Sequence, residues 1–441
     1  MLNFKSLFQK NSVRKIFSST AVYAGGNLLT KAISFILIPI LTRVLTPHDY
    51  GTLATFVAVF AIVQMVIYMG TTDAIIRVYF DREKTDFDFP KYVFNGFFVS
   101  LMMFFIVLSI FYVGKQFFSK VIPIPFGYQI LIPVLGLFVA IYGIPSKLWV
   151  IMKKPIPYTI FNLSSILIEV VLSLLLVVVV GLNWQGRVWA LTLSKLIFFV
   201  VSIYILFRHN FFRISLDKTY FKSVINYGFP VVLHSLGFVI IAAIDRFFLN
   251  KFIGISVTGV YSVSYAICSM IAFFAGAFNL AWVPYFYEKL GSITRDHKLR
   301  LVQFTYIYFA LILLGVAAFI GLVPFALKIL VGGKFSGVKA FIPWLAVGFG
   351  FHSMYAIVVS YIFYMKKTYI LSKIAIFTVI LSFVANYILI NINGAIGVAQ
   401  ATCIVFFCRF LLVWYFSNKT YSMPWFTFSR PWKVKTAKSF L

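Results

Sequence analysis

The chain has 441 residues, of which 62% are hydrophobic and only 11% are charged, and its mean hydropathy is +0.97. This composition excludes a soluble globular domain and requires lipid as the solvent. The formal net charge of +28 does not indicate a nucleic-acid binder, because the basic residues lie between apolar runs and do not gather on a folded soluble module.

Twelve apolar runs follow one another along the chain, each close to the ~20 residues that a helix needs to span the hydrocarbon core. With their loops they occupy nearly the whole length, which leaves no room for a soluble catalytic domain. The second run is expected to continue as a helix past Gly70 towards Phe80. The runs cover residues 19–42, 50–70, 91–113, 128–152, 157–181, 184–207, 223–249, 256–284, 301–326, 340–364, 369–391 and 395–416.

The basic residues alternate along this series. Residues within six positions of the end of a run are counted with the adjoining loop. The N-terminal tail, the even-numbered loops and the C-terminal tail then hold 27 Lys and Arg residues, whereas the odd-numbered loops, which include Arg187, hold 9. Because cytoplasmic loops are enriched in Lys and Arg, this threefold bias predicts a multi-pass protein with both termini in the cytoplasm. The first apolar run is too long for a signal peptide and has no clear cleavage site, so it is expected to be a retained helix.

The two halves of the chain resemble each other weakly. In each, a tyrosine (Tyr23 or Tyr227) precedes a helix, a short loop, a glycine (Gly51 or Gly259) and a second helix that ends in Tyr-Phe. Six helices per half predict two lobes related by an axis along the membrane normal, with a cavity at their interface. The expected organisation is a lobe over 1–207, a cytoplasmic linker over 208–222, a second lobe over 223–416 and a basic cytoplasmic tail over 417–441.

Two segments resemble a known family. Ala21 to Phe80, with LTPHDYG at Leu45–Gly51 and TTDAIIRVYF at Thr71–Phe80, resembles the start of Wzx-type polysaccharide flippases of the multidrug/oligosaccharidyl-lipid/polysaccharide exporter superfamily. DRFFLNKFIGISVTGVYSVSYAI, at Asp245–Ile267, resembles the seventh and eighth helices of that family.

The resemblance implies an all-α integral membrane protein with two six-helix lobes around a central cavity. It implies transport of undecaprenyl-pyrophosphate-linked oligosaccharide, such as an O-antigen repeat unit, from the inner to the outer leaflet of the bacterial cytoplasmic membrane. The motifs themselves are expected to be mainly structural, because the short, Gly-ended loop after Pro47 suits a tight helix connection.

Charged residues at membrane depth are the first candidates for function, since each costs about 2.5–3.5 kcal/mol on insertion scales. Lys31, near the middle of the first helix, is the leading candidate for contacting a pyrophosphate or an acidic sugar; the alternative is a structural lysine. Glu169 and Lys195 lie at similar depths in neighbouring antiparallel helices, so we expect them to pair, as a structural ion pair or in substrate binding or proton coupling.

Two acidic-basic pairs lie nearer the helix ends. Asp73 and Arg77 are spaced i, i+4, which favours an intrahelical ion pair at the interface over cavity lining, although Arg77 is also a candidate for substrate binding. Asp245 and Arg246 are adjacent and point about 100° apart on a helix, so Arg246 is expected to snorkel outwards. Asp73, Asp245 and Arg246 are candidates for ion coupling or gating.

Arg409, in the last helix, is expected either to contact the substrate pyrophosphate or to reach anionic headgroups. No nucleotide-binding GxxxxGK[ST] loop is present, and the GGK at Gly332–Lys334 lacks its spacing. No Cys/His cluster indicates a metal or a cofactor, and no residue is expected to be catalytic. Energy is therefore expected from the substrate gradient or from a coupling cation, a proton or sodium, for which Asp73, Glu169 and Asp245 are the acidic candidates.

Two other function classes stay open. A drug or cation antiporter of the same superfamily would need an acidic cavity, whereas the midplane charges here are Lys31 and Lys195 against Glu169. A membrane-embedded polysaccharide polymerase or ligase would need a catalytic outer loop, and the longest, Gly114–Gly127, offers no acid/base pair. The expected partners are a lipid-linked oligosaccharide, membrane lipids and polysaccharide polymerase machinery.

Overall fold

The computed structural model describes residues 10–81, 87–291 and 295–425, which are almost entirely helical and contain no strand. This confirms the all-α membrane class. The helices are α1 (Lys10–Val44), α2 (Pro47–Tyr68), α3 (Thr71–Val78), α4 (Phe89–Val113), α5 (Lys115–Val121), α6 (Phe126–Ile151), α7 (Pro155–Ser173), α8 (Asn183–Arg208), α9 (Lys218–Phe252), α10 (Ile255–Gly291), α11 (Arg295–Leu330), α12 (Val338–Tyr364) and α13 (Tyr369–Thr420). A π-helical segment, η3 (Leu174–Val179), continues α7, and η2 (Tyr79–Asp81) and η4 (Gly333–Phe335) are short 3₁₀ helices.

Within the described residues, ten helices are long and apolar enough to cross a membrane. α9, bent by 45° between its two pieces, adds an eleventh candidate. α13 has 52 residues, enough for about 78 Å of helix against a hydrocarbon core of ~30 Å, and a kink at Gly394, with φ 57° and ψ −140°, divides it into two parts. α13 is therefore long enough for two crossings, and the total of twelve stays a prediction.

Helix starts follow local capping chemistry. Thr46 and Asp49 form a capping box at the start of α2, where Pro47 takes the first helical position. Asp88 caps α4 and Asp217 caps α9 through side-chain oxygens that accept from backbone N–H groups. These polar caps define where α2, α4 and α9 begin.

The outer faces of the helices carry large exposed apolar side chains, as expected where lipid is the neighbour. On α11 they are especially dense: Leu311, Leu313, Leu314, Leu322, Phe325 and Ile329.

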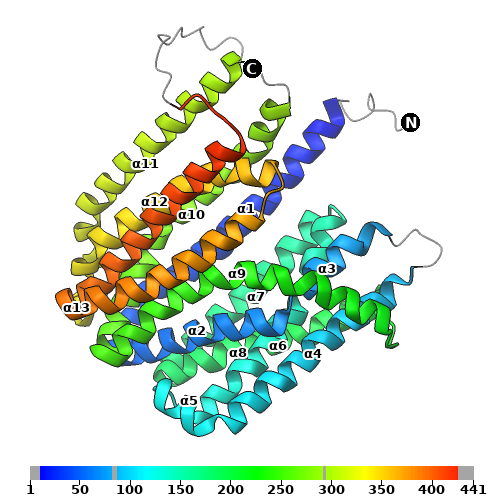
Figure 1. The fold of residues 1–441 in the computed structure, drawn as a ribbon. Helices are drawn as coiled ribbons and strands as arrows, with labels where there is room; N and C mark the ends of the chain where they lie inside the picture. The colour runs from blue at the N-terminus through cyan, green and yellow to red at the C-terminus, as the bar shows by residue number, and fades with distance from the viewer. Residues whose placement is uncertain (1–9, 82–86, 292–294, 426–441) are drawn as a thin grey trace.

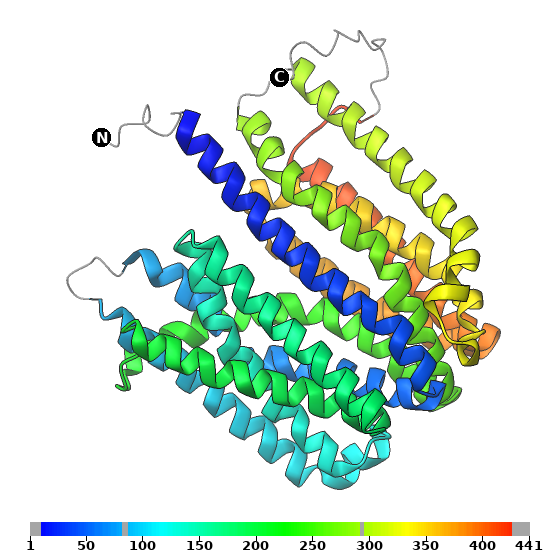
Figure 2. The ribbon, with the colours of Figure 1, turned by 180° about the vertical axis from the view of Figure 1, so that it is seen from behind.

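The helices form two lobes, α1 to α8 and α10 to α13, between which α9 crosses (Figure 1). Seen from behind, α1 lies along the boundary between them (Figure 2). The start of α1, the end of α13 and the connection 209–217 lie at one end of the molecule, which we call the terminal end. The α1–α2 and α9–α10 connections and α5 lie at the opposite end, the far end. The charge bias predicts that the terminal end is cytoplasmic.

The lobes meet glycine against glycine at the far end. A methyl group added to Gly51 would overlap the carbonyl oxygen of Ile255, and one added to Gly259 would overlap the carbonyl oxygen of Pro47. Each glycine thus packs on the residue four positions before the other, which is the reciprocity of a two-fold arrangement. Gly51 was expected to serve the tight connection between α1 and α2. Its closest contact is instead with α10 of the other lobe.

Helix continues past Gly70 towards Phe80, as expected, but with a break that the sequence analysis did not predict. Met69 and Gly70 both have positive φ, 45° and 65°, and a new helix, α3, begins at Thr71. A side chain at Gly70 would collide with the backbone of Gly228 on α9. The break therefore lies where α9 crosses α2 and α3 at backbone distance, which only glycine permits on both sides.

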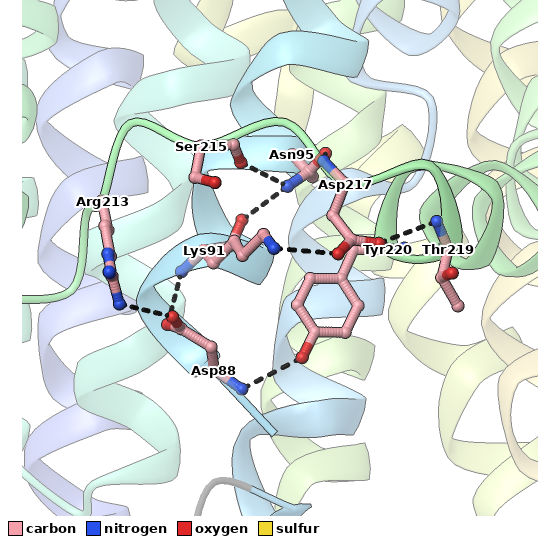
Figure 3. A network of polar contacts seen from close by, with 8 residues as sticks. All are labelled: Asp88, Lys91, Asn95, Arg213, Ser215, Asp217, Thr219 and Tyr220. Carbon is pink, nitrogen blue, oxygen red and sulfur yellow. Dashed lines mark hydrogen bonds and ion pairs between the residues drawn. The ribbon is translucent and has the colours of Figure 1, made fainter. Parts of the chain in front are cut away.

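The connection between the lobes is fastened to the start of α4 (Figure 3). The Lys91 ammonium lies 2.9 Å from the Asp217 carboxylate, and Arg213 lies 3.0 Å from Asp88. Asn95 donates to the carbonyl of Ser215 and accepts from the N–H of Asp217. We call these contacts the linker clasp; they hold the start of α9 against the first lobe, and α9 begins at Lys218, inside the expected linker.

Candidate functional site

The expected contact between Glu169 and Lys195 is confirmed. Glu169 is buried on α7, and the Lys195 ammonium on α8 lies 3.2 Å from its carboxylate. Lys195 also donates to the hydroxyl of Ser165 at 2.9 Å. Burial costs both ions their hydration, and the ion pair together with the hydrogen bond to Ser165 offsets part of that cost.

Arg187 is the member of this cluster that the sequence analysis missed. Its guanidinium lies 2.7 Å from the Glu169 carboxylate and donates to Ser173 at 2.8 Å. The charge count assigned Arg187 to an outer loop, whereas it stands in the first turns of α8 and faces α7. The sequence feature that could have identified it is its position inside the apolar run 184–207, where a charged residue is costly. Glu169 thus forms ion pairs with both Arg187 and Lys195, and Lys195 serves this cluster as a structural cation.

A second buried charge cluster lies in the other lobe, around Asp245 of α9. This carboxylate is fully buried and accepts three hydrogen bonds: from Tyr261 at 2.7 Å, from Thr402 at 2.9 Å and from Asn386 at 3.2 Å. The three donors come from α10 and the two parts of α13. Asp245 therefore joins three helices of the second lobe, and the neutral donors satisfy a group that would otherwise be costly to bury.

Arg246 does not snorkel outwards, contrary to expectation. Only 9% of the residue is exposed, and its guanidinium lies 4.2 Å from the ring centroid of Tyr265. It donates to the carbonyl of Ala242 at 2.8 Å and stands 3.9 Å from the Asp245 carboxylate. Aromatic stacking and the neighbouring carboxylate together keep the cation inside the lobe.

Arg409 is buried as well, with 3% of the residue exposed and its guanidinium 4.8 Å from the ring centroid of Tyr355. The alternative in which Arg409 reaches anionic headgroups is therefore wrong, because the side chain packs inside the second lobe.

Lys31 has a different environment. It is exposed, and its ammonium lies 5.1 Å from the ring centroid of Phe273 on α10. Since α1 belongs to the first lobe and α10 to the second, Lys31 lies where the lobes face each other. No ion pair joins it to a carboxylate in the described part of the chain, so its charge is available to a ligand.

Asp73 and Arg77 do not pair, contrary to expectation. Asp73 accepts from the Tyr68 hydroxyl at 2.8 Å, and the guanidinium of Arg77 lies 4.9 Å from the ring centroid of Tyr227 on α9. The break at Gly70 turns α3 towards α9, which supplies Arg77 with a ring to stack on. The pattern i, i+4 permits a pair but does not require it.

Arg77 instead lines a cleft of about 800 Å³ between α3 and the first four turns of α9. We call it the basic cleft. Three of its lining residues, Arg77, Lys218 and Lys222, are cationic, and none is acidic. The other lining residues are Thr219, Ser223, Asn226, Tyr227, Pro230 and Val231.

The described residues contain no group of three or more His, Cys, Asp or Glu side chains that could hold a metal ion. The charged side chains are arranged instead as buried structural clusters within each lobe and as accessible cations between and beside the lobes. This arrangement suits binding and passage of an anion.

Comparison with known proteins identifies the family. Residues 16–289 match the model of the family described as polysaccharide biosynthesis protein. The chain belongs to this family. Among curated relatives, a protein of the Lsg locus of Haemophilus influenzae is 22% identical, over 83% of this chain and 89% of its own length. An uncharacterized membrane protein of the same organism is 25% identical, over 80% of this chain and 85% of its own length.

Solved structures show the fold. An inward-facing multidrug resistance MATE family transporter of the MOP superfamily superposes with a TM-score of 0.69 at 14% identity, covering 91% of this chain and 94% of that one. An outward-facing conformation of such a transporter gives 0.61, also at 14% identity, covering 92% and 95%. The expected resemblance is thereby confirmed: this member of the polysaccharide biosynthesis protein family has the two-lobed fold of membrane transporters.

Proposed function

We propose that this protein is a flippase that moves undecaprenyl-pyrophosphate-linked oligosaccharide from the inner to the outer leaflet of the bacterial cytoplasmic membrane. The observation that carries the proposal is the transporter fold in a chain of the polysaccharide biosynthesis protein family. Sugar and pyrophosphate groups cannot cross hydrocarbon unaided, because they would lose water without replacement. A protein path with polar and cationic groups supplies that replacement.

Alternating access between the lobes is the proposed mechanism. The glycine contact at Gly51 and Gly259 offers a small, close pivot at the far end. α9 leaves the first lobe at the linker clasp and reaches Asp245 in the second, so it links the two bodies while they rock. The higher TM-score with the inward-facing transporter supports a state that is open at the terminal end, where the substrate would be loaded.

The distribution of charge favours an anionic substrate. Lys31 and the cations of the basic cleft are accessible, whereas Glu169 and Asp245 are buried and bound by protein groups. A cationic drug would need the opposite arrangement, with accessible carboxylates. The solved neighbours include multidrug transporters, so export of cationic compounds is the rival that the experiment must exclude.

Asp245 is the proposed site of coupling to a proton or a sodium ion, since its ligands come from three helices that would move with the second lobe.

Both termini are proposed to be cytoplasmic, and the substrate is an O-antigen or other surface polysaccharide repeat unit that polymerase machinery would receive on the outer side.

The test is transport by the purified protein in liposomes, with two substrates measured side by side. A lipid-linked oligosaccharide should become accessible in the opposite leaflet faster than in protein-free liposomes, and a fluorescent cationic dye should not be moved. Dye transport without movement of the oligosaccharide would identify a drug exporter instead.

A further inference from the structure

We propose, building on the flippase function above, that the basic cleft is a docking site for the phosphate end of a membrane-embedded lipid. In the flippase this lipid is the substrate, held by its phosphate at the terminal end before it passes between the lobes. The same chemistry could be offered by an anionic phospholipid of the bilayer, and the experiment below separates the two sources.

The two lysines of the basic cleft are placed where α9 itself gives them no advantage. Lys218 and Lys222 are four residues apart, so they stand on one face of α9, and like charges at this spacing are destabilising. Lys218 is also the first residue of the helix, where the helix dipole disfavours a positive charge. A bound anion removes both penalties.

The neighbouring carboxylates are already engaged. Asp217 pairs with Lys91 and caps the N–H groups of Thr219 and Tyr220 (Figure 3). Asp73 accepts from Tyr68 and does not pair with Arg77. The cleft therefore keeps its positive charge for a ligand.

Arg77 is oriented for anion binding. Its guanidinium lies over the ring of Tyr227, 4.9 Å from the ring centroid, which holds the group at the wall of the cleft without using its N–H donors. A planar fork of donors suits the oxygens of a phosphate. Thr219, Ser223 and Asn226 add neutral hydrogen-bonding groups along the same wall.

The cleft also has an apolar end, which favours a lipid over free phosphate. Its wall passes from Lys218 to Pro230 and Val231, about 20 Å further along α9 and hence deeper towards the membrane. The two lysines lie at the start of this wall, Arg77 lies beside Tyr227 further along it, and the apolar residues follow. Cations that lead to an apolar end match a phosphate attached to a hydrocarbon chain.

Two contacts keep the cleft in shape. The linker clasp fixes the first turn of α9 on α4, and the backbone contact of Gly70 with Gly228 fixes the fourth turn at the break between α2 and α3. Both walls are thus held by the first lobe, so the cations are positioned before a ligand arrives.

The experiment measures binding to the purified full-length protein in nanodiscs of zwitterionic lipid. The probes are farnesyl pyrophosphate, phosphatidylglycerol and inorganic pyrophosphate. The test variant neutralises the cleft with Arg77→Gln, Lys218→Gln and Lys222→Gln. The matched control, Lys367→Gln, Lys373→Gln and Lys419→Gln, removes the same charge from exposed lysines outside the cleft.

We expect the test variant to bind farnesyl pyrophosphate about tenfold more weakly, and the control variant to change binding less than about twofold. Inorganic pyrophosphate should bind more weakly than farnesyl pyrophosphate. If only the farnesyl probe loses affinity, the source is the isoprenoid substrate; if phosphatidylglycerol loses affinity equally, the source is the bilayer. Equal binding by the test variant and the wild type would overturn the docking site.

A second variant guards against misfolding. Tyr227→Leu removes the ring under Arg77 and leaves all three charges in place, and we expect an intermediate loss of binding. Transport by the wild type is measured separately. Transport of a lipid-linked oligosaccharide with unchanged binding in the test variant would refute the docking site alone, whereas no transport by the wild type would refute the flippase.

Discussion

Gly51 and Gly259 lie against each other at the far end of the molecule, each packed on the helix start that carries the other. The contact joins α2 of the first lobe to α10 of the second without any side chain between the backbones. It gives a structural reason for the glycine that the two halves share: each half uses it to build the same contact with the other half.

Gly51→Ala should therefore destabilise the protein, although alanine is normally the better helix residue. The added methyl overlaps the carbonyl oxygen of Ile255, and such overpacking costs about 1–3 kcal/mol. Gly25→Ala is the matched control, since nothing lies within 4 Å of a methyl group at that position of α1. Thermal midpoints of the purified variants should fall for Gly51→Ala and stay level or rise for Gly25→Ala. Equal midpoints would argue against a close contact between the lobes.

Glu169→Gln should be among the most damaging substitutions in the first lobe. It leaves Arg187 and Lys195 partly buried without their carboxylate, at a cost of about 3–5 kcal/mol. Double-mutant cycles with Arg187→Met and Lys195→Met should each give a coupling energy of about 1–3 kcal/mol in thermal or denaturant unfolding. A coupling near zero for both pairs would mean that the cluster does not form.

Lys31→Ala should lower transport of a lipid-linked oligosaccharide about tenfold without lowering membrane abundance, because one charge-assisted contact with the substrate is lost. Lys115→Ala is the matched control: Lys115 also lies 5.1 Å from an aromatic ring, that of Phe126, but at the far end. Unchanged transport in the Lys31 variant would remove this residue from the mechanism.

Asp245→Asn should uncouple transport from an imposed ion gradient. If Asp245 takes up the coupling ion, the wild type should transport faster under an inward proton or sodium gradient, and the variant should show the same rate with and without it. Asp217→Asn, in the linker clasp, changes a carboxylate outside the buried cluster and should keep the gradient dependence. A variant at Asp245 that still responds to the gradient would place coupling elsewhere.

The linker clasp should weaken in acid. The hydrogen bond from Lys91, together with the N–H groups of Tyr220 and Thr219, lowers the pKa of Asp217 below its ordinary value of 3.8. The stabilisation is thus complete above that ordinary value and is lost as the pH falls through the lower value of the folded protein. The difference in thermal midpoint between the wild type and Lys91→Gln should shrink to zero at low pH, while that for Lys115→Gln stays constant. A Lys91 difference that persists in acid would contradict the ion pair.

Composition and hydropathy are sufficient to predict the helical membrane fold and most helix positions, because a span must be long and apolar whatever it contacts. They also placed Glu169 and Lys195 at the same depth. They could not place the break at Met69 and Gly70 or the short helix α5, because the break depends on α9, which is distant in the sequence, and α5 lies in a loop without a span-length pattern.

The same limit applies to the charged residues. A sequence shows that Arg246 and Arg409 lie near membrane depth, but their burial depends on the rings of Tyr265 and Tyr355, which other helices supply. Arg187 was assigned to a loop for the same reason, since its partner Glu169 is on another helix. The basic cleft likewise arises only when α3 and α9 are brought together.

The initial rate at which a lipid-linked oligosaccharide crosses the bilayer of proteoliposomes tests the flippase most directly. Oligosaccharide that reaches the outer leaflet can be detected with a glycosidase that does not cross the membrane. The account predicts a rate well above that of protein-free liposomes and lowered by Lys31→Ala. A rate equal to that of protein-free liposomes, from folded protein, would contradict it.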